Sequence, residues 1–382
     1  MFYEIPPAGN AIVVRRARRQ SPAVVQQWQP FAARWFGSGT SALAAAVRAA
    51  IARRPVEAPE VLVPAYGCPD IVSAVLCAGA KPVLVDLVPD RPWLDLGQVE
   101  RAIGRSTVAV VAINFLGIPE RIEALRKLID AARLTLIEDC AQTFPSQADE
   151  VSSLGGDFVV LSFGRGKPVS LLGGGAVLAR TEQLATLLLP PDGKPSGGRG
   201  RFLLKAAAYN FLRRPHVYWI LNALPFLGLG KTEFTALTQI EPVPAGVVDK
   251  LDANAERYRQ IGRVQQDWIR EALRSLPRAR YIDLAEQCAE GRPRLLRYPL
   301  LIRDAAACDR VYAALSRDGL GGSRMYQRPL IDIPGIKEVV RNDAQFPNAR
   351  RFAESLLTLP THAHVRRRDV DRIAATLARE LS

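Results

Sequence analysis

The sequence predicts an α/β fold: a mostly parallel sheet with helices on both faces, followed by a smaller C-terminal α/β domain. Short β-branched runs alternate with helical stretches in the first part of the chain, and this alternation is typical of such sheets. The strand-like runs are continuously apolar, as expected of strands buried on both faces. The regular alternation of strand-like and helical stretches ends after residue 182. We therefore expect a large domain with an N-terminal arm at 1–182, a connection or lid at 183–245, and a helix with the small domain at 246–382.

The expected strands of the large domain are residues 61–64, 81–87, 107–114, 134–139 and 158–163. The alanine-rich stretch 40–54 predicts a helix with Thr40 as its N-cap. Residues 119–133 predict a second helix with Pro119 in its first turn. Ligands of such sheets bind beyond the carboxyl ends of the strands, so the residues that follow the strands are site candidates.

The second half of the chain has a different character. Residues 190–201 predict a loop because they are rich in glycine and proline. Residues 202–232 are apolar, aromatic and basic. Residues 249–276 predict a long amphipathic helix that is broken at most once. From residue 295 onward strands and helices alternate again, which indicates the small domain.

Composition places the chain among soluble globular proteins, because 48% of it is hydrophobic and 23% charged. The five cysteines are scattered, without CxxC pairs or zinc spacing. We therefore expect free thiols, a reducing cytoplasm and no metal site. The N-terminus lacks an apolar signal-peptide core, and no apolar run is long enough to span a bilayer.

The net charge of +13 is the unusual feature of the composition, and arginines cluster at Arg15–Arg19 and Arg366–Arg368. Three explanations are open: nucleic acid, an anionic membrane or substrate, or solvated faces. Aromatic residues do not interleave with the arginines, and no nucleic-acid-binding motif is present. We therefore expect no nucleic acid partner.

A set of polar residues falls where a ligand site is expected. Asp139 ends one predicted strand and Ser162 the next, while Gln142 and Lys167 follow them. The segment GSGTSAL (37–43) places glycines and hydroxyls before a helix, which suits a phosphate. A phosphate cradle, a lysine able to form a Schiff base and a carboxylate for a ring nitrogen are the parts of a pyridoxal phosphate site.

With these residues in their order, nearly the whole chain resembles the DegT/DnrJ/EryC1/StrS family of pyridoxal phosphate-dependent sugar aminotransferases of fold type I. The resemblance lies in five segments, which are VLVPAYGCPDIVSAVLCAGAKPVLVDL (61–87), INFLGIPERIEAL (113–125), IEDCAQ (137–142), SFGRGK (162–167) and FPNARRFAESLLTLPTH (346–362).

The resemblance implies a role for each site residue. Lys167 would bind the cofactor as a Schiff base and then take part in proton transfer, and Asp139 would keep the pyridine nitrogen protonated. Gln142 would hydrogen-bond the phenolic oxygen. The cofactor phosphate would be held by Ser162, Thr40 and Ser41.

The chain departs from the family pattern at four places. Cys68, which the resemblance implies as a cofactor-binding residue, stands where the family has an aromatic residue over the cofactor ring, with Tyr66 two residues before it. Either weaker stacking or a different side chain must therefore cover that face. LGGG (172–175) lacks the family's glutamate. The asparagine segment that reaches the partner subunit's cofactor phosphate has no counterpart in 183–245. Ile331 replaces a histidine.

The resemblance implies an aminotransferase that moves an amino group from glutamate or glutamine to a nucleotide-linked keto sugar. It would work by a ping-pong mechanism, as a homodimer, in polysaccharide or natural-product biosynthesis. A pyridoxal phosphate-dependent dehydratase or a lyase acting on a non-sugar substrate is the first alternative. Residues 201–234 are open to three interpretations: a lid over the site, a dimer contact, or a membrane-surface module that contacts anionic lipid at the inner membrane face.

Overall fold

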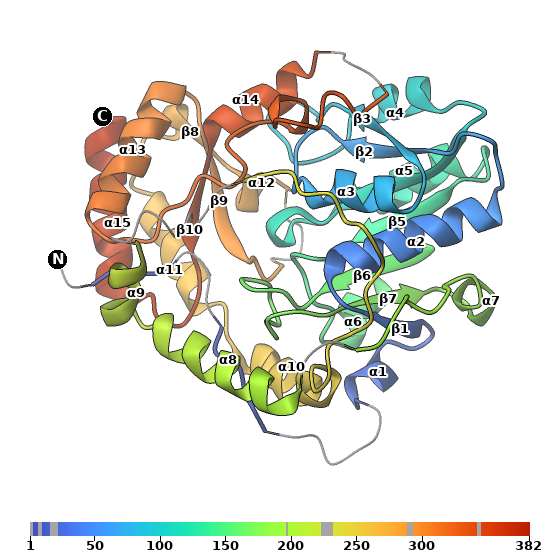
Figure 1. Cartoon of the computed structure of the whole chain (residues 1–382). Coiled ribbons are helices and arrows are strands. Elements are labelled where there is room, and N and C mark those ends of the chain that lie inside the picture. The colour runs from blue at the N-terminus through green and yellow to red at the C-terminus, as the bar shows by residue number, and fades with distance from the viewer. Residues whose placement is uncertain are drawn as a thin grey trace.

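The computed structural model describes residues 3–6, 10–15, 22–195, 198–222, 232–288, 293–341 and 345–382. Two sheets organise them: a seven-stranded sheet in the first half of the chain and a three-stranded sheet in the second. Figure 1 shows the large sheet between layers of helices, with the small sheet and its helices at the opposite end of the molecule.

The large sheet has the strand order β1-β7-β6-β5-β4-β2-β3. Its strands are β1 (Ala32–Phe36), β2 (Glu60–Pro64), β3 (Lys81–Val85), β4 (Thr107–Ile113), β5 (Thr135–Asp139), β6 (Phe158–Ser162) and β7 (Gly175–Ala179). Strands β2 to β6 pair in parallel, whereas β7 is antiparallel to both β6 and β1. The expected mostly parallel sheet is confirmed. The sequence pattern does not predict the edge strand β1, whose short segment AARWF lacks a long β-branched run.

Alternate side chains of one strand enter different cores. Val61 and Val63 of β2 pack in the cluster that includes α2 (Gly39–Arg53) and α3 (Asp70–Cys77). Leu62 packs in the cluster that includes α4 (Leu96–Ala102) and α5 (Ile122–Ile129). Helices therefore cover both faces, as the continuously apolar strands predict.

Two predicted helix starts are wrong. Helix α2 is capped by Ser38 rather than Thr40, because Ser38 has an extended backbone and its Oγ accepts a hydrogen bond from the Ser41 amide at 3.0 Å. Helix α5 begins at Ile122, so Pro119 lies outside its first turn. The Pro119 carbonyl instead accepts a hydrogen bond from the Trp93 indole at 2.9 Å.

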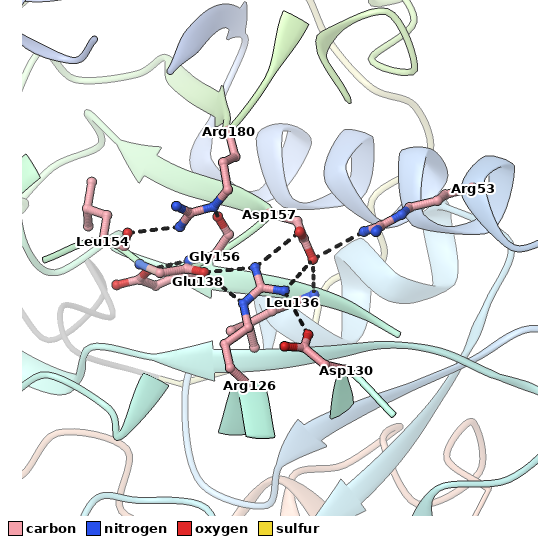
Figure 2. A network of polar contacts seen from close by, with 10 residues as sticks. Arg53, Arg126, Asp130, Leu136, Glu138, Leu154, Gly156, Asp157 and Arg180 are labelled. Atoms are coloured by element: carbon pink, nitrogen blue, oxygen red, sulfur yellow. Dashed lines mark hydrogen bonds and ion pairs between the residues drawn. The ribbon is translucent and has the colours of Figure 1, made fainter. Parts of the chain in front are cut away.

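At the amino-terminal edge of the sheet, a polar network joins helices from both faces (Figure 2). The buried carboxylate of Asp157, just before β6, accepts a hydrogen bond from the Leu136 amide at 2.8 Å. The same carboxylate pairs with Arg53 of α2 at 3.2 Å and with Arg126 of α5 at 3.1 Å. This edge is therefore fixed, and it lies opposite the edge where ligands of such sheets bind.

The small sheet has the order β10-β9-β8 and is antiparallel. Its strands are β8 (Tyr281–Asp283), β9 (Arg297–Ile302) and β10 (Leu356–Pro360). The predicted long helix 249–276 is broken once, into α10 (Leu251–Gln260) and α11 (Val264–Leu273). Helices α13 (Ala305–Arg317) and α15 (Arg367–Leu381) pack against each other and complete this part of the chain.

The described part of the segment 183–245 includes the end of α7 (Glu182–Ala185) and the helices α8 (Arg199–Leu212) and α9 (Pro215–Asn222). The predicted loop 190–201 therefore ends in the first residues of α8. The N-terminal arm lies beside α8 and α9, because Pro215 accepts a hydrogen bond from the Glu4 amide at 3.0 Å. The remaining α-helices of the described residues are α1 (Val24–Gln27), α6 (Ala148–Ser152), α12 (Leu284–Cys288) and α14 (Pro347–Ser355).

Candidate active site

The candidate site lies at the carboxyl ends of β5 and β6. Asp139 is the last residue of β5 and Ser162 the last residue of β6, and the two strands are parallel neighbours. Gln142 follows three residues after Asp139, and the loop that carries Lys167 follows Ser162. The structure therefore brings these four predicted site residues to one edge of the sheet.

Asp139 is a buried carboxylate. Burial raises its pKa above the usual range, although the hydrogen bond from the Ala141 amide and the charge of Lys167 act in the opposite direction. Its Oδ1 accepts the Ala141 hydrogen bond at 2.8 Å. Among the residues that the structure describes, no hydrogen bond to its other carboxylate oxygen is found. A protonated ring nitrogen would compensate this desolvated negative charge.

Lys167 lies half-buried in the loop after β6. Gly166, the residue before it, has a left-handed backbone with φ of 74°. The charge of Lys167 acts on both Asp139 and Cys68. Lys167 also lines a cavity of about 40 Å³ together with Tyr258, Arg294 and other residues of the second half of the chain. Lys167 thus lies beside a cavity that residues from both halves of the chain line.

A narrow approach joins the start of α2 to the end of β6. A Cβ atom on Gly39 would lie 2.6 Å from Ser162 Cβ and 2.7 Å from Ser162 Oγ, so only glycine leaves room for this contact. The Ser162 hydroxyl therefore stands at the N-terminus of a 15-residue helix. The first amides of a helix and a nearby hydroxyl can together bind a phosphate.

The two hydroxyl residues of the α2 start have partners inside the protein. Thr40 Oγ1 donates a hydrogen bond to Asp70 Oδ2 at 3.2 Å. Ser41 is fully buried, and its Oγ accepts hydrogen bonds from Ser38 Oγ at 3.2 Å and from the Glu241 amide at 3.3 Å. The side chain of Ser41 thus joins α2 to the segment that follows the α8–α9 pair.

Gln142 reaches a residue that the sequence motifs do not reveal. Its Oε1 accepts a hydrogen bond from the Leu116 amide at 2.6 Å, and its Nε2 donates to the Tyr326 hydroxyl at 3.4 Å. The Tyr326 hydroxyl also interacts with the Cys68 thiol, whose pKa burial raises to about 11. Tyr326 therefore contacts two predicted cofactor-binding residues, although it is far from both in the chain.

The neighbour of Cys68, Tyr66, is engaged in the interior. Its hydroxyl donates a hydrogen bond to the Met325 carbonyl, and its ring lies 5.0 Å from the Phe352 ring and 6.0 Å from the Tyr326 ring. Tyr66 thus supports the turn that carries Tyr326.

Three non-glycine residues at this site have left-handed backbones. They are Leu116, Leu172 and Tyr326, with φ of 56°, 63° and 49°. Leu116 and Tyr326 both contact Gln142, and Leu172 belongs to the LGGG segment. That segment packs under the start of α2, because the Gly174 amide donates to the Gly37 carbonyl at 2.7 Å. Unfavourable backbone conformations of this kind gather at functional sites.

His362, His364 and Ile331, which replaces the family's histidine, lie in buried or partly buried surroundings. His362 is buried, its Nε2 lies 2.7 Å from the Pro6 carbonyl, and burial lowers its pKa to about 3. Burial also lowers the pKa of His364 to about 4. Ile331 is buried. Within the described residues no group of three His, Cys, Asp or Glu side chains could hold a metal ion.

The chain matches the model of the DegT/DnrJ/EryC1/StrS aminotransferase family over residues 32–203 and 247–378. It is 27% identical to the UDP-N-acetyl-3-dehydro-alpha-D-glucosamine 3-aminotransferase of Acidithiobacillus ferrooxidans, over 90% of this chain and 83% of that enzyme. A shorter match, 35% identical over 34% of this chain and 35% of the relative, is to the dTDP-3-amino-3,4,6-trideoxy-alpha-D-glucose transaminase of Streptomyces venezuelae.

Solved structures share the fold. Helicobacter pylori PseC, an aminotransferase involved in the biosynthesis of pseudoaminic acid, superposes with a TM-score of 0.72 at 15% identity and covers 99% of both chains. Bacillus subtilis NtdA with bound cofactor PMP superposes with a TM-score of 0.67 at 17% identity, over 91% of this chain and 73% of that chain. These likenesses establish a fold-type I architecture.

The residues present fit pyridoxal phosphate, the cofactor of this family. Gly39 leaves a space beside Ser162 that a Cβ atom would fill, at the place where a phosphate is expected. The buried Asp139 carboxylate and the amine of Lys167 supply the other two groups that this cofactor requires. The chain therefore belongs to the DegT/DnrJ/EryC1/StrS aminotransferase family and is a pyridoxal phosphate-dependent aminotransferase.

Proposed function

We propose that this enzyme moves an amino group from glutamate or glutamine to a nucleotide-linked keto sugar by a ping-pong mechanism. The observation that carries the proposal is the placement of Asp139, Lys167 and Gln142 together at the carboxyl edge of the sheet, beside the Gly39–Ser162 approach. The relative that matches most of the chain is named for a UDP-linked amino sugar, which supports a nucleotide-sugar acceptor.

Each site residue has a proposed task. Pyridoxal phosphate, when bound, supplies an electron sink for bond breaking at the substrate carbon that bears nitrogen. Lys167 Nζ would hold the cofactor covalently and, as a free amine, would move the proton of that carbon. The buried Asp139 carboxylate would keep the ring nitrogen protonated, because the two charges compensate each other in a dry site.

The phosphate is assigned to the start of α2. The amides of its first turn, Thr40, Ser41 and the Ser162 hydroxyl would bind the phosphate oxygens. Ser41 would act chiefly through its position, because its hydroxyl already has partners in Ser38 and Glu241.

Tyr326 is the side chain that we propose to cover the cofactor ring where Cys68 replaces the family's aromatic residue. Cys68 is too small to stack on a ring, and Tyr326 reaches both its thiol and the Gln142 amide. We therefore assign Tyr326 to the face of the cofactor ring that the family covers with an aromatic residue. Gln142 would orient the phenolic oxygen of the cofactor, with the Leu116 amide fixing its side chain.

The enzyme is proposed to be a homodimer with a different cross-subunit contact. The segment where the family's asparagine would lie packs on its own chain, since the Gly37 amide donates to the Glu241 carbonyl at 2.7 Å. All five cysteines are free, which supports work in a reducing cytoplasm.

Half-reaction spectroscopy tests this function. Purified enzyme should show a visible cofactor band that glutamate or glutamine bleaches, and a keto nucleotide sugar should restore the band with formation of the amino sugar. Other amino acids serve as donor controls. Bleaching that no keto sugar reverses would contradict the acceptor, and a band that neither donor changes would contradict the donors.

A further inference from the structure

Helix α8 has an inner face that is firmly attached to the protein. Phe202 and Ala206 are buried in a core cluster. The side chain of Asn210 pairs with the backbone of Ile12 in both directions, accepting from its amide at 2.8 Å and donating to its carbonyl at 2.9 Å. The orientation of α8 about its own axis is therefore fixed by the N-terminal arm and the core.

The outer face of α8 is also apolar. Leu203, Leu204 and Phe211 are exposed to 44%, 72% and 54% of their surfaces, and Ala207 and Ala208 between them are exposed as well. This spacing places all five side chains on one face of the helix. A surface helix normally turns polar residues outward, so a continuous apolar face opposite the packed one indicates a binding surface.

Helix α9 continues the surface. Its Ile220 is exposed to 45%, and its Trp219 indole donates to the His216 carbonyl at 2.8 Å. Figure 1 shows α8 and α9 on the outer edge of the molecule, beside the N-terminal arm. Residues 223–231 of the apolar, basic segment 201–234 lie outside the described residues. We call the exposed apolar side chains of α8 and α9 the outer helix face; they are Leu203, Leu204, Ala207, Ala208, Phe211 and Ile220.

The charge around this face has one sign. Every acidic or basic side chain between Asp192 and Glu233, apart from His216, is a lysine or an arginine. Arg201, Lys205 and Arg214 are exposed beside the apolar residues, and the Arg214 guanidinium lies 5.8 Å from the centre of the Phe211 ring. The occupant of the outer helix face must therefore combine apolar and anionic character.

We propose that the outer helix face binds the surface of an anionic lipid bilayer. Leu203, Leu204 and Phe211 would enter the headgroup region while the flanking cations contact lipid phosphates. No helix in the described parts of the chain is long and apolar enough to cross a bilayer. A second copy of the chain is a poorer occupant, because two segments carrying only positive charge repel each other.

Vesicle flotation of the full-length holoenzyme tests the proposal. At about 50 mM salt the protein should float with vesicles of phosphatidylcholine and phosphatidylglycerol and stay behind with phosphatidylcholine alone, and about 500 mM salt should release most of it. Absence of flotation on the anionic vesicles at low salt would overturn the proposal.

Paired variants locate the contact. We expect Leu204→Ser/Phe211→Ser and Arg201→Gln/Lys205→Gln each to reduce the bound fraction by about tenfold, with amino transfer unchanged in solution. The matched controls Leu189→Ser, at a residue exposed to 65% after α7, and Lys81→Gln, at the start of β3, should bind like the wild type. Equal loss in the controls would overturn the assignment to this face.

Measuring the oligomeric state tests the competing occupant, which is a second copy of the chain. Light scattering should give the same mass for the wild type and for Leu204→Ser/Phe211→Ser. If that double variant lowers the mass from dimer to monomer, the outer helix face is a subunit contact and the membrane proposal is wrong.

Discussion

The side-chain amide of Gln142 donates a hydrogen bond to the Tyr326 hydroxyl at 3.4 Å, although 184 residues separate the two in the chain. This contact joins the loop after β5 to a bend in the segment between α13 and α14. It brings a tyrosine beside Cys68, at the place where an aromatic side chain over the cofactor ring is missing. The second half of the chain thus contributes Tyr326 to the candidate site, whose other proposed residues lie in the first half.

Replacing Tyr326 should therefore weaken cofactor binding. We expect Tyr326→Ala to raise the Kd of pyridoxal phosphate by about tenfold or more, or about 1.4 kcal/mol, because the ring face loses its cover. Tyr326→Phe keeps the ring and should change Kd by less than about threefold, since it loses only the contacts of the hydroxyl with the Gln142 amide and the Cys68 thiol. Fluorescence titration of the apoenzyme measures both values.

A compensating substitution separates ring cover from simple damage. Cys68→Phe in the Tyr326→Ala background places an aromatic residue where the family has one, and it should recover part of the lost affinity. Wild-type affinity in Tyr326→Ala would show that this tyrosine does not cover the ring.

Gly39→Ala tests the phosphate approach. Its Cβ would lie 2.6 Å from Ser162 Cβ, so the hydroxyl must move and we expect at least about tenfold weaker binding of pyridoxal phosphate. Gly104→Ala is the matched control, because a Cβ there has no neighbour within 4 Å. Equilibrium dialysis of both variants gives the comparison. An unchanged Kd in Gly39→Ala would place the phosphate elsewhere.

Asp139 should lower the stability of the cofactor-free protein at neutral pH. Burial raises its folded-state pKa above the unfolded value, so its ionised form costs free energy in the fold. Below the unfolded value the carboxyl group is neutral in both states and that cost vanishes, and the cost appears as pH rises through the raised pKa. Asp139→Asn removes the titration while keeping an acceptor for the Ala141 amide.

The pH dependence of thermal unfolding reveals this cost. The apo Asp139→Asn variant should have a higher Tm than the wild type at pH 7, and the difference should shrink toward pH 4. Asn114→Asp serves as a contrasting variant, because it adds a carboxyl group beside the buried Glu138, 2.9 Å from the present amide. A Tm difference that stays constant with pH would contradict the raised pKa.

Local sequence motifs predict the positions of several candidate site residues. They do not predict the residues that reach the site through contacts between distant parts of the chain. Asp139 and Ser162 could be placed because each ends a recognisable apolar strand, and Lys167 because it follows Ser162 within a few residues. Tyr326 could not, because its link to Gln142 depends on how the two halves of the chain pack.

Two details of the fold, the N-cap of α2 and the strand β1, could not be predicted from the sequence either. Ser38 and Thr40 are both good N-cap residues, and only the extended backbone of Ser38 decides between them. Strand β1 is stabilised by its pairing with β7, and the short sequence AARWF alone does not predict this strand. In both cases tertiary packing, rather than local preference, fixes the outcome.

The central claim is that Lys167 binds the cofactor covalently, and peptide mass spectrometry after borohydride reduction tests it most directly. Reduction converts the bond between the cofactor aldehyde carbon and a lysine nitrogen to a stable amine. We predict a phosphopyridoxyl group on Lys167 in the wild type, and no such adduct in Lys167→Ala, which should also lose its visible absorption band while keeping the circular dichroism of the folded protein. An adduct on another lysine, or a visible band that survives dialysis in Lys167→Ala, would contradict the account.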